Sequence, residues 1–268
     1  MRGIMCLLCV LFSGCAQYQS VTPTVIALFA HPDDETWVAG TLMHVQQHHI
    51  NVVPVYVTSG DRGSDRSGRG LSGDKLANVR EHETKQALQH LTLPPPVFLR
   101  YKDGQTSAQL SQIAADIDTI AKQYAAPVML CFSQGGITAN SDHVALAELC
   151  QSRYFAHQLV FSISNTRAER LEATAKAHQF EYPIKSAVTD TLISHRVDVT
   201  HFKAQKILAV DSHSTQFPAV IVNAFSAFVD QAPYEELIAT APSSRVQQVL
   251  NVLPHYNKKS NIDKHVRH

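Results

Sequence analysis

The stretch Ala30-His31-Pro32-Asp33-Asp34-Glu35 decides how the rest of this chain is interpreted. It directly follows an apolar run at 25–29 that lacks polar alternation, which is typical of a strand buried on both faces. A segment with helical character, 36–49, comes next. In parallel α/β sheets, ligands bind outside the carboxyl ends of the strands, at turns of this kind. The stretch therefore predicts a parallel α/β fold, and it places a ligand-binding site at the carboxyl end of its first strand.

This turn crowds one histidine and three carboxylates into five positions. Adjacent acids repel one another unless a positive charge lies among them, and a divalent cation bound by imidazole nitrogen and carboxylate oxygen would supply it. The N-terminus of a helix would also favour Asp33, Asp34 and Glu35 through the helix dipole, but it gives His31 no role. The spacing alone leaves both interpretations open.

Strand-like and helix-like segments alternate along most of the chain. We expect strands at 25–30, 52–58, 97–101, 127–132 and 159–163, and helices at 36–49, 75–91, 110–124 and 144–154. This alternation predicts right-handed βαβ units and a Rossmann-like three-layer α/β/α fold. Its central sheet would be mostly parallel, with the active site at the carboxyl ends of the strands. The pattern then weakens, and we expect a helix at 167–178, a strand at 187–192, helices at 201–211 and 218–230, and a weakly amphipathic piece at 246–252.

The beginning of the chain is expected to lie outside the fold. A positively charged start precedes an apolar run, 4–12, that is too short to span a bilayer and is typical of a signal peptide. Small residues before Cys15 resemble a bacterial lipoprotein signal, which predicts a signal peptide at 1–14, lipidation of Cys15 and a tether at 15–22. An ordinary signal, cleaved or uncleaved, is the alternative. The main domain would cover 23–242, followed by a partly helical tail at 243–268.

These expectations place the protein in a bacterial cell envelope, anchored by lipid and facing the periplasm. The outer membrane is favoured because Ala16, rather than Asp, follows Cys15. An envelope location permits a disulfide between Cys131 and Cys150, although their apolar neighbours favour two buried free thiols. The formal net charge is zero and no basic patch is evident, so we expect no nucleic-acid partner.

A second polar stretch, Asn140-Ser141-Asp142-His143, follows the fourth expected strand and its glycine-rich turn and opens a helix. Strands that are distant in sequence can present their carboxyl ends to one crevice, so this stretch is the best candidate for a further metal ligand. Ser141 or Asp142 would also serve as the helix N-cap. A cap accounts for the aspartate but does not require His143.

The two stretches together resemble the PIG-L/LmbE-like family of zinc-dependent N-deacetylases, over about residues 24–217. Further similar positions lie after the second and third strands, on the helix between them and late in the chain: Thr58, Gly60, Arg80, Glu83, Asp103-Gly104, Asp198-Val199-Thr200, Lys206 and His213-Ser214-Thr215-Gln216. The six-residue first motif is specific, whereas the others alone are weak.

The resemblance implies that His31, Asp34 and His143 bind Zn²⁺ or another divalent metal, and that Asp33 is the general base. Arg80 and Asp103 would lie in or behind the substrate pocket. The family's second motif usually reads His-Pro-Asp-His, and its first histidine is Asn140 here. An asparagine can donate a hydrogen bond to an oxyanion but cannot carry a proton at neutral pH. Asp33 would then handle both proton transfers, or the activity would be lowered or redirected.

Three functions follow from this interpretation. The first is removal of an acetyl group from an N-acetylglucosamine-type sugar or glycoconjugate. The second is metal-dependent hydrolysis of another N-acyl or amide compound. The third is a catalytically impaired, carbohydrate-binding envelope protein. Glu35 is expected behind the metal or at the helix start, and His213 as a packed or capping residue rather than a ligand.

Overall fold

The computed structural model describes residues 23–152, 155–239 and 241–257. The expected signal peptide, the lipidation of Cys15, the tether and the end of the tail lie outside these residues. Within the described part of the chain, no helix is both long enough and apolar enough to cross a membrane.

A seven-stranded sheet forms the centre of the fold, in the order β3-β2-β1-β4-β5-β7-β6. Its strands are β1 (Thr24–Phe29), β2 (Asn51–Thr58), β3 (Val97–Tyr101), β4 (Val128–Phe132), β5 (Gln158–Ser162), β6 (His195–Asp198) and β7 (Tyr234–Ile238). Strands β1 to β5 pair in parallel, and β7 pairs antiparallel with both β5 and β6. The expected mostly parallel sheet is therefore confirmed.

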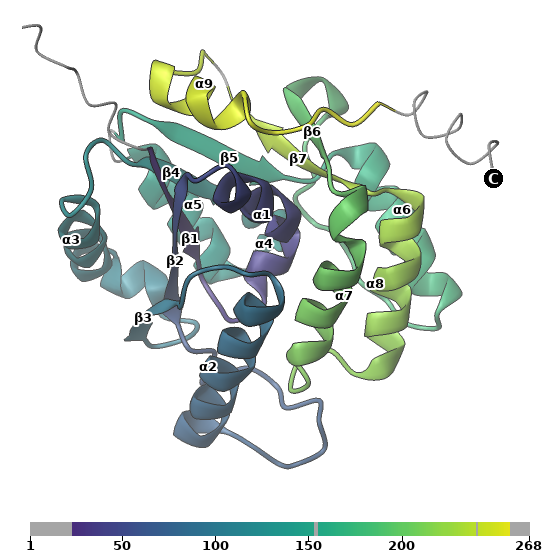
Figure 1. The fold of residues 1–268 in the computed structure, drawn as a ribbon. Coiled ribbons are helices and arrows are strands. Elements are labelled where there is room, and N and C mark those ends of the chain that lie inside the picture. The colour runs from purple at the N-terminus through teal and green to yellow at the C-terminus, as the bar shows by residue number, and fades with distance from the viewer. Residues whose placement is uncertain (1–22, 153–154, 240, 258–268) are drawn as a thin grey trace, which may run out of the picture.

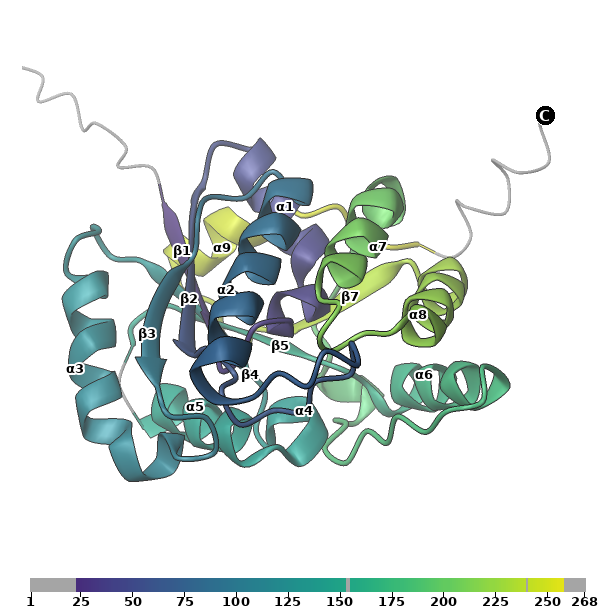
Figure 2. The same ribbon diagram turned by 90° about the horizontal axis from the view of Figure 1, so that it is seen from below.

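Helices cover both faces of this sheet and make three layers, as predicted (Figures 1 and 2). Helices α1 (Ala39–Gln47), α2 (Gly73–His90) and α7 (Lys203–Ser212) lie on one face, and α3 (Leu110–Ala121) and α5 (Ser141–Ser152) lie on the other. The remaining helices are α4 (Gly136–Ala139), α6 (Asn165–Ala177), α8 (Ala219–Gln231) and α9 (Ser244–Leu250), with short 3₁₀ turns η1 (Asp34–Trp37), η2 (Thr106–Gln109), η3 (Asp190–Leu192) and η4 (Thr200–Phe202).

The apolar runs seen in the sequence become the middle of the sheet. Every residue of β1 and of β4 is buried, because these two adjacent strands have helices on both sides. Burial on both faces explains why neither strand alternates between apolar and polar residues. The two central strands are thus rigid supports for the loops at their carboxyl ends.

Several sequence expectations about local structure are wrong. The single helix expected at 36–49 is instead the turn η1 followed by α1 from Ala39. The strand expected at 187–192 forms only isolated bridges at Ser186 and Val188, and the chain pairs with the sheet later, in β6. Strand β7 was not expected, because its sequence Tyr-Glu-Glu-Leu-Ile contains two acids that are buried in the fold.

Cys131 and Cys150 form a disulfide, so the expected pair of free thiols is also wrong. Cys131 lies on β4 and Cys150 on α5, which packs over that strand with the two Cα atoms 6.6 Å apart. At the other end of the chain, Val246, Val249 and Leu250 of α9 are buried in the main core. The folded unit therefore includes residues beyond the expected boundary at 242.

Candidate metal centre and catalytic pocket

The strand order places the two polar motifs at one position in the sheet. From β1 the chain continues to β2 on one side, and β4, which arrives later, pairs with the other side of β1. Such a reversal of strand order opens a crevice at the carboxyl ends of the two strands. The loop after β1 carries His31 and Asp34, and the segment after β4 carries Asn140 and His143.

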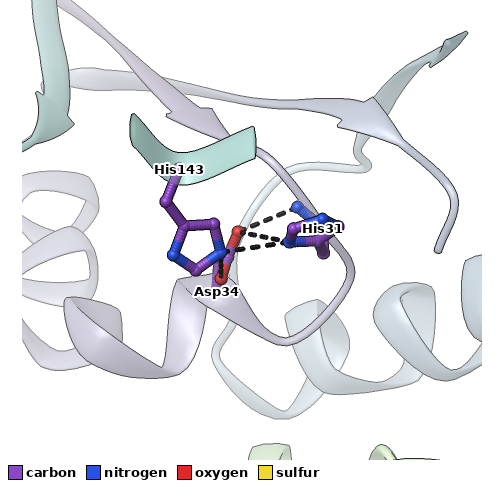
Figure 3. A group of neighbouring side chains, drawn as sticks. All are labelled: His31, Asp34 and His143. Carbon is purple, nitrogen blue, oxygen red and sulfur yellow. Dashed lines mark hydrogen bonds and ion pairs between the residues drawn. The ribbon is translucent and has the colours of Figure 1, made fainter. Parts of the chain in front are cut away.

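Three ligand atoms converge in this crevice (Figure 3). His31 Nδ1 lies 3.0 Å from His143 Nε2, which lies 3.1 Å from Asp34 Oδ1. The Asp34 carboxylate also approaches His31, with Oδ2 3.8 Å from Nδ1. All three residues are buried, and their ligand atoms lie within 4.8 Å of one another. The predicted ligand residues are therefore brought together by the fold.

The opposite atoms of the same side chains are held by the surrounding protein. His31 Nε2 lies 3.2 Å from Asp142 Oδ2 and 3.3 Å from Asp103 Oδ1, while His143 Nδ1 lies 3.0 Å from the carbonyl oxygen of Gly136. Carboxylate and carbonyl oxygens only accept hydrogen bonds here, so these partners assign the ring protons to His31 Nε2 and His143 Nδ1. The two nitrogens that face each other are then both unprotonated.

This arrangement fits a bound cation. Lone pairs on two nitrogens and one carboxylate oxygen point at the same space, and such atoms repel unless a positive charge lies between them. Asp34 Oδ2 is fixed by the amides of Ala30 at 2.9 Å and His31 at 2.8 Å, which leaves Oδ1 for the shared space. Two imidazoles and one carboxylate are a donor set found in catalytic zinc sites.

Electrostatics lead to the same conclusion. Burial opposes protonation of His31, but hydrogen bonds to Asp103 and Asp142 outweigh it and raise the pKa of His31 to about 10. Burial would raise the pKa of Asp34, yet the neighbouring His143 and His31 hold that pKa below its ordinary value. The pocket therefore favours a positive charge beside Asp34, which a proton on His31 supplies when no ion is bound and a cation would supply in its place.

A second group of possible ligands, His31, Asp103 and Asp142, uses the other nitrogen of the same histidine. Asp142 is already engaged there, because Oδ2 accepts the amide of Gly104 at 2.6 Å and Oδ1 that of Thr106 at 3.2 Å. Carboxylates that accept the second ring proton of a metal-bound histidine orient that histidine. Asp142 and Asp103 fit this orienting position better than a ligand position. The sequence reasoning missed this role of Asp142, although its place beside His143 was a usable signal.

Asp33 lies next to the three ligand atoms without joining them. Its backbone is left-handed, with φ of 101°, which is costly for a residue with a side chain and is typical of functional sites. The carbonyl of Asp33 accepts the amide of Thr36 at 3.0 Å and its hydroxyl at 2.7 Å, so the strained turn is held in place. Burial, reinforced by repulsion from Asp34, raises the pKa of Asp33 to about 7.

A polar pocket of about 420 Å³ opens above these residues. The expected substrate-pocket residue Arg80 forms part of its wall, where its guanidinium donates to the carbonyls of Gly60 at 3.0 Å and Ser64 at 3.1 Å. A Cβ on Gly63 would lie 2.2 Å from Arg80 Nη1, so only glycine allows this close approach. Asp103 also lines the pocket, and its Oδ2 accepts the amide of Arg62 at 3.2 Å.

Asn140 is exposed at the edge of the same pocket. Its Oδ1 accepts the amide of Asp142 at 2.8 Å, which makes Asn140 the N-cap of α5. The expectation that Ser141 or Asp142 caps this helix is therefore wrong, because the helix begins at Ser141, earlier than the expected start at 144. With Oδ1 committed to the cap, the amide group Nδ2 remains as a donor for a ligand.

Residues late in the chain form hydrogen bonds with the first motif on the side away from the ligand atoms. Glu35 Oε1 lies 2.5 Å from His213 Nε2, and Oε2 accepts the hydroxyl of Tyr56 at 3.0 Å. Gln216 donates to the carbonyl of Pro32 at 2.8 Å. Glu35 and His213 are thus placed outside the group of ligand atoms. Trp37, Tyr182 and Phe217 also line the pocket and were missed, because no motif in the sequence includes these aromatic side chains.

The chain is similar in sequence to known deacetylases. Residues 26–154 match the PIG-L family model, described as GlcNAc-PI de-N-acetylase. A 1D-myo-inositol 2-acetamido-2-deoxy-alpha-D-glucopyranoside deacetylase from Actinosynnema mirum is 24% identical over 232 residues, covering 72% of this chain and 81% of that protein. The matched region of the family model contains both polar motifs.

Solved structures show the same fold at low sequence identity. The N,N'-diacetylchitobiose deacetylase from Pyrococcus horikoshii superposes with a TM-score of 0.57 at 19% identity, covering 84% of this chain and 85% of that one. A 4-carboxy-2-hydroxymuconate hydratase from Pseudomonas putida superposes with a TM-score of 0.52 at 15% identity, covering 82% and 97%. Because proteins with different reactions share this fold, the reaction has to be argued from the site.

Proposed function

The chain belongs to the PIG-L/LmbE-like family of N-deacetylases, and from this premise we propose that it is a zinc-dependent hydrolase of an N-acetylglucosamine-type sugar or glycoconjugate. One observation carries the metal part of the proposal. Two imidazole nitrogens and one carboxylate oxygen share a buried space at the base of an open, polar pocket. His31, Asp34 and His143 are the proposed ligands.

A divalent cation at this position would polarise an amide carbonyl and lower the pKa of a water molecule. Asp33 supplies the acid–base group. It lies beside Asp34 in the pocket wall, but its carboxylate is not among the converging atoms. Asp33 accepts a proton from the attacking water and then delivers it to the leaving amine, so that one residue serves both proton transfers.

Asn140 stabilises the oxygen of the amide as negative charge develops on it. The cap of α5 uses Oδ1, which leaves Nδ2 as a donor on a residue that lines the pocket. A fixed donor of this kind lowers the barrier without taking part in proton transfer. Arg80 and Asp103 complete the pocket: Arg80 fixes the loop after β2, and Asp103 helps to orient His31.

We also propose that the protein acts in the bacterial envelope, anchored through Cys15. The disulfide between Cys131 and Cys150 supports an oxidising compartment, where such bonds persist. Mass spectrometry of the N-terminal peptide from membranes tests this part. A diacylglyceryl-modified Cys15 is expected, and an unmodified Cys15 would contradict the anchor.

The catalytic proposal is tested by acetate release from a panel of N-acetylated sugars, using the purified full chain with its metal content measured in parallel. Acetate and free amine should appear in equal amounts, stop on chelation and return with zinc. Asp33→Asn should keep the metal and lose about 10²- to 10⁴-fold in kcat/KM, the usual contribution of an acid–base group. Asp211→Asn, an exposed position on α7, is the matched control and should match the parent.

Two outcomes would contradict the proposal. Parental activity in Asp33→Asn on a proven substrate would show that another group transfers the proton. A fully metal-loaded protein that releases acetate from none of the sugars would remove the N-acetyl sugar assignment. It would leave hydrolysis of another N-acyl compound, or a binding function, to be tested.

A further inference from the structure

A second pocket lies against the catalytic pocket and shares part of its wall. Thr36, Trp37, Tyr182 and Phe217 line both cavities. Beyond these four residues, the second cavity extends between α6, α7 and α8, where Ala224 forms part of its lining. Its volume is about 60 Å³. The catalytic pocket therefore adjoins a small cavity in the helical layer, and these four side chains stand between the two.

The walls of this second cavity are apolar. Leu171 of α6, Val210 of α7, and Ile221 and Phe225 of α8 contribute aliphatic and aromatic surface. The shared residues Trp37 and Phe217 continue this surface to the edge of the catalytic pocket. By contrast, the catalytic pocket is lined largely by charged and amide side chains. The two adjoining cavities thus differ sharply in the kind of group that they can accept.

Two cationic residues also line the apolar cavity, and their charged groups contact other parts of the protein. The ammonium group of Lys206 donates to the carbonyl of Thr36 at 3.0 Å and forms an ion pair with Glu235. The guanidinium of Arg167 lies over two rings, 4.8 Å from the centre of Phe228 and 5.4 Å from that of Tyr234.

We propose that this cavity binds the acyl chain of the substrate, so that the enzyme hydrolyses N-acyl groups longer than acetyl. The inference rests on the proposed function. An amide carbonyl carbon carries two substituents, here the amino sugar and the alkyl chain of the acyl group. With the carbonyl at the metal centre, the sugar matches the polar pocket, and the alkyl chain matches the apolar cavity beside it.

The size of the cavity sets the length of the chain. About 60 Å³ holds roughly two to four water-sized groups and is too small for a second sugar ring. The preferred acyl group therefore extends about two to four carbons beyond the methyl of acetyl, which corresponds to butyryl through hexanoyl. Each methylene that moves from water into the cavity should raise kcat/KM by roughly fourfold.

The test is a chain-length series on one amino sugar that the enzyme deacetylates, with acetyl, butyryl, hexanoyl and dodecanoyl groups. The proposal expects kcat/KM to rise from acetyl to butyryl, to peak at butyryl or hexanoyl, and to fall for dodecanoyl. A butyryl substrate cleaved at least tenfold more slowly than the acetyl substrate would overturn it. Because acetate release is measured in the same series, that result would leave the proposed deacetylase function intact.

Variants locate the effect in the cavity. Ala224→Leu fills the space from α8 and should lower the butyryl-to-acetyl ratio of kcat/KM by about tenfold. Ala219→Leu adds the same side chain on the exposed start of that helix and should leave the ratio unchanged. Phe225→Ala enlarges the cavity and should move the optimum to a longer chain, a gain that a misfolded protein could not show. An unchanged ratio in Ala224→Leu together with an unchanged optimum in Phe225→Ala would overturn the assignment.

Discussion

The parallel part of the sheet and its antiparallel edge contribute differently to the site. The loops after β1 and β4 supply His31, Asp34 and His143, the atoms that converge in the crevice. Strand β7, at the antiparallel edge, supplies no atom to this group, yet it carries Glu235 and Glu236, which are almost completely buried. One region provides the chemistry, and the other provides buried charges that hold the backbone around it.

The contacts of Glu235 show how the edge strand acts on the motif. Its two carboxylate oxygens accept the amides of Gly40 at 2.9 Å and Thr41 at 2.7 Å, at the start of α1. Its partner Lys206 donates to the carbonyl of Thr36, two residues after the proposed ligand Asp34. The ion pair of Glu235 and Lys206 thus holds the backbone of the segment that follows the metal motif. Substitutions in the parallel region should therefore affect mainly zinc binding and activity, whereas substitutions at the edge should affect mainly stability.

The largest effect is expected for a ligand in the parallel region. His143→Ala removes one of three proposed ligands and should abolish tight zinc binding, with activity falling by about 10³-fold or more because chemistry depends on the metal. The metal-free protein should remain folded, since the change removes one stacking contact, on Phe132, and leaves the disulfide and the rest of the core in place. Zinc content by elemental analysis, together with circular dichroism, checks both expectations. Retained zinc at parental affinity would show that His143 is not a ligand.

A change at the antiparallel edge should have the opposite effect and lower the stability of the fold rather than zinc binding. Lys206→Met leaves Glu235 buried without its cation, and breaking a buried ion pair in this way costs about 3–5 kcal/mol of folding free energy. Urea unfolding measures the loss. Lys203→Met is the matched control on the same helix, because Lys203 pairs with Asp230 at the exposed surface, where ion pairs contribute about 0–1 kcal/mol. Equal stability of the two variants would contradict a supporting role for the edge strand.

A smaller effect is expected at the orienting carboxylate. Asp142→Asn weakens the acceptor of the His31 ring proton, and changes of this type cost about 10- to 100-fold in metal affinity. Competition with a zinc chelator gives the affinity directly. Asp116→Asn, which alters an exposed carboxylate bonded to Tyr101, should leave the affinity at the parental value. A parental affinity in Asp142→Asn would mean that Asp103 alone orients the imidazole.

The smallest effect concerns the cap of α5. Asn140→Ala removes the acceptor of the Asp142 amide and should cost about 1 kcal/mol of stability, whereas Asn140→Ser keeps a side-chain oxygen for the cap and should restore most of it. Thermal unfolding of the two variants compares them. If both were as stable as the parent, the cap would not contribute to stability, and the position would matter only through the pocket.

The sequence predicted the parallel region well because that region obeys local rules. Uninterrupted apolar runs become buried strands, and the polar motifs that follow β1 and β4 meet because the carboxyl ends of adjacent parallel strands share one edge. This geometry points to the first motif and to the stretch at 140–143 as sources of ligands, and the family resemblance implies that the ligands are His31, Asp34 and His143. A family resemblance added the roles of these residues, which the spacing alone did not give.

The antiparallel edge could not be predicted in the same way. Tyr234–Ile238 includes two acids that a pattern of hydrophobicity assigns to the surface, and their burial depends on partners distant in sequence. Glu236, for example, accepts the amide and hydroxyl of Ser164 at 2.6 and 2.9 Å and pairs with Arg196. The disulfide and the Asn140 cap were missed for a related reason. Each depends on the residue at which α5 begins and on which side of the helix faces β4. The hydrophobic periodicity of the sequence defines the start of a helix only to within a few residues.

The central claim is that two separated loops share one metal ion at the carboxyl ends of β1 and β4. The most direct test is a crystal structure of the zinc-loaded protein with anomalous scattering measured at the zinc edge. The account predicts one peak about 2.0–2.2 Å from His31 Nδ1, Asp34 Oδ1 and His143 Nε2. A peak held by His31 Nε2 with Asp103 and Asp142 instead, or no peak in the crevice at full zinc occupancy elsewhere, would contradict it.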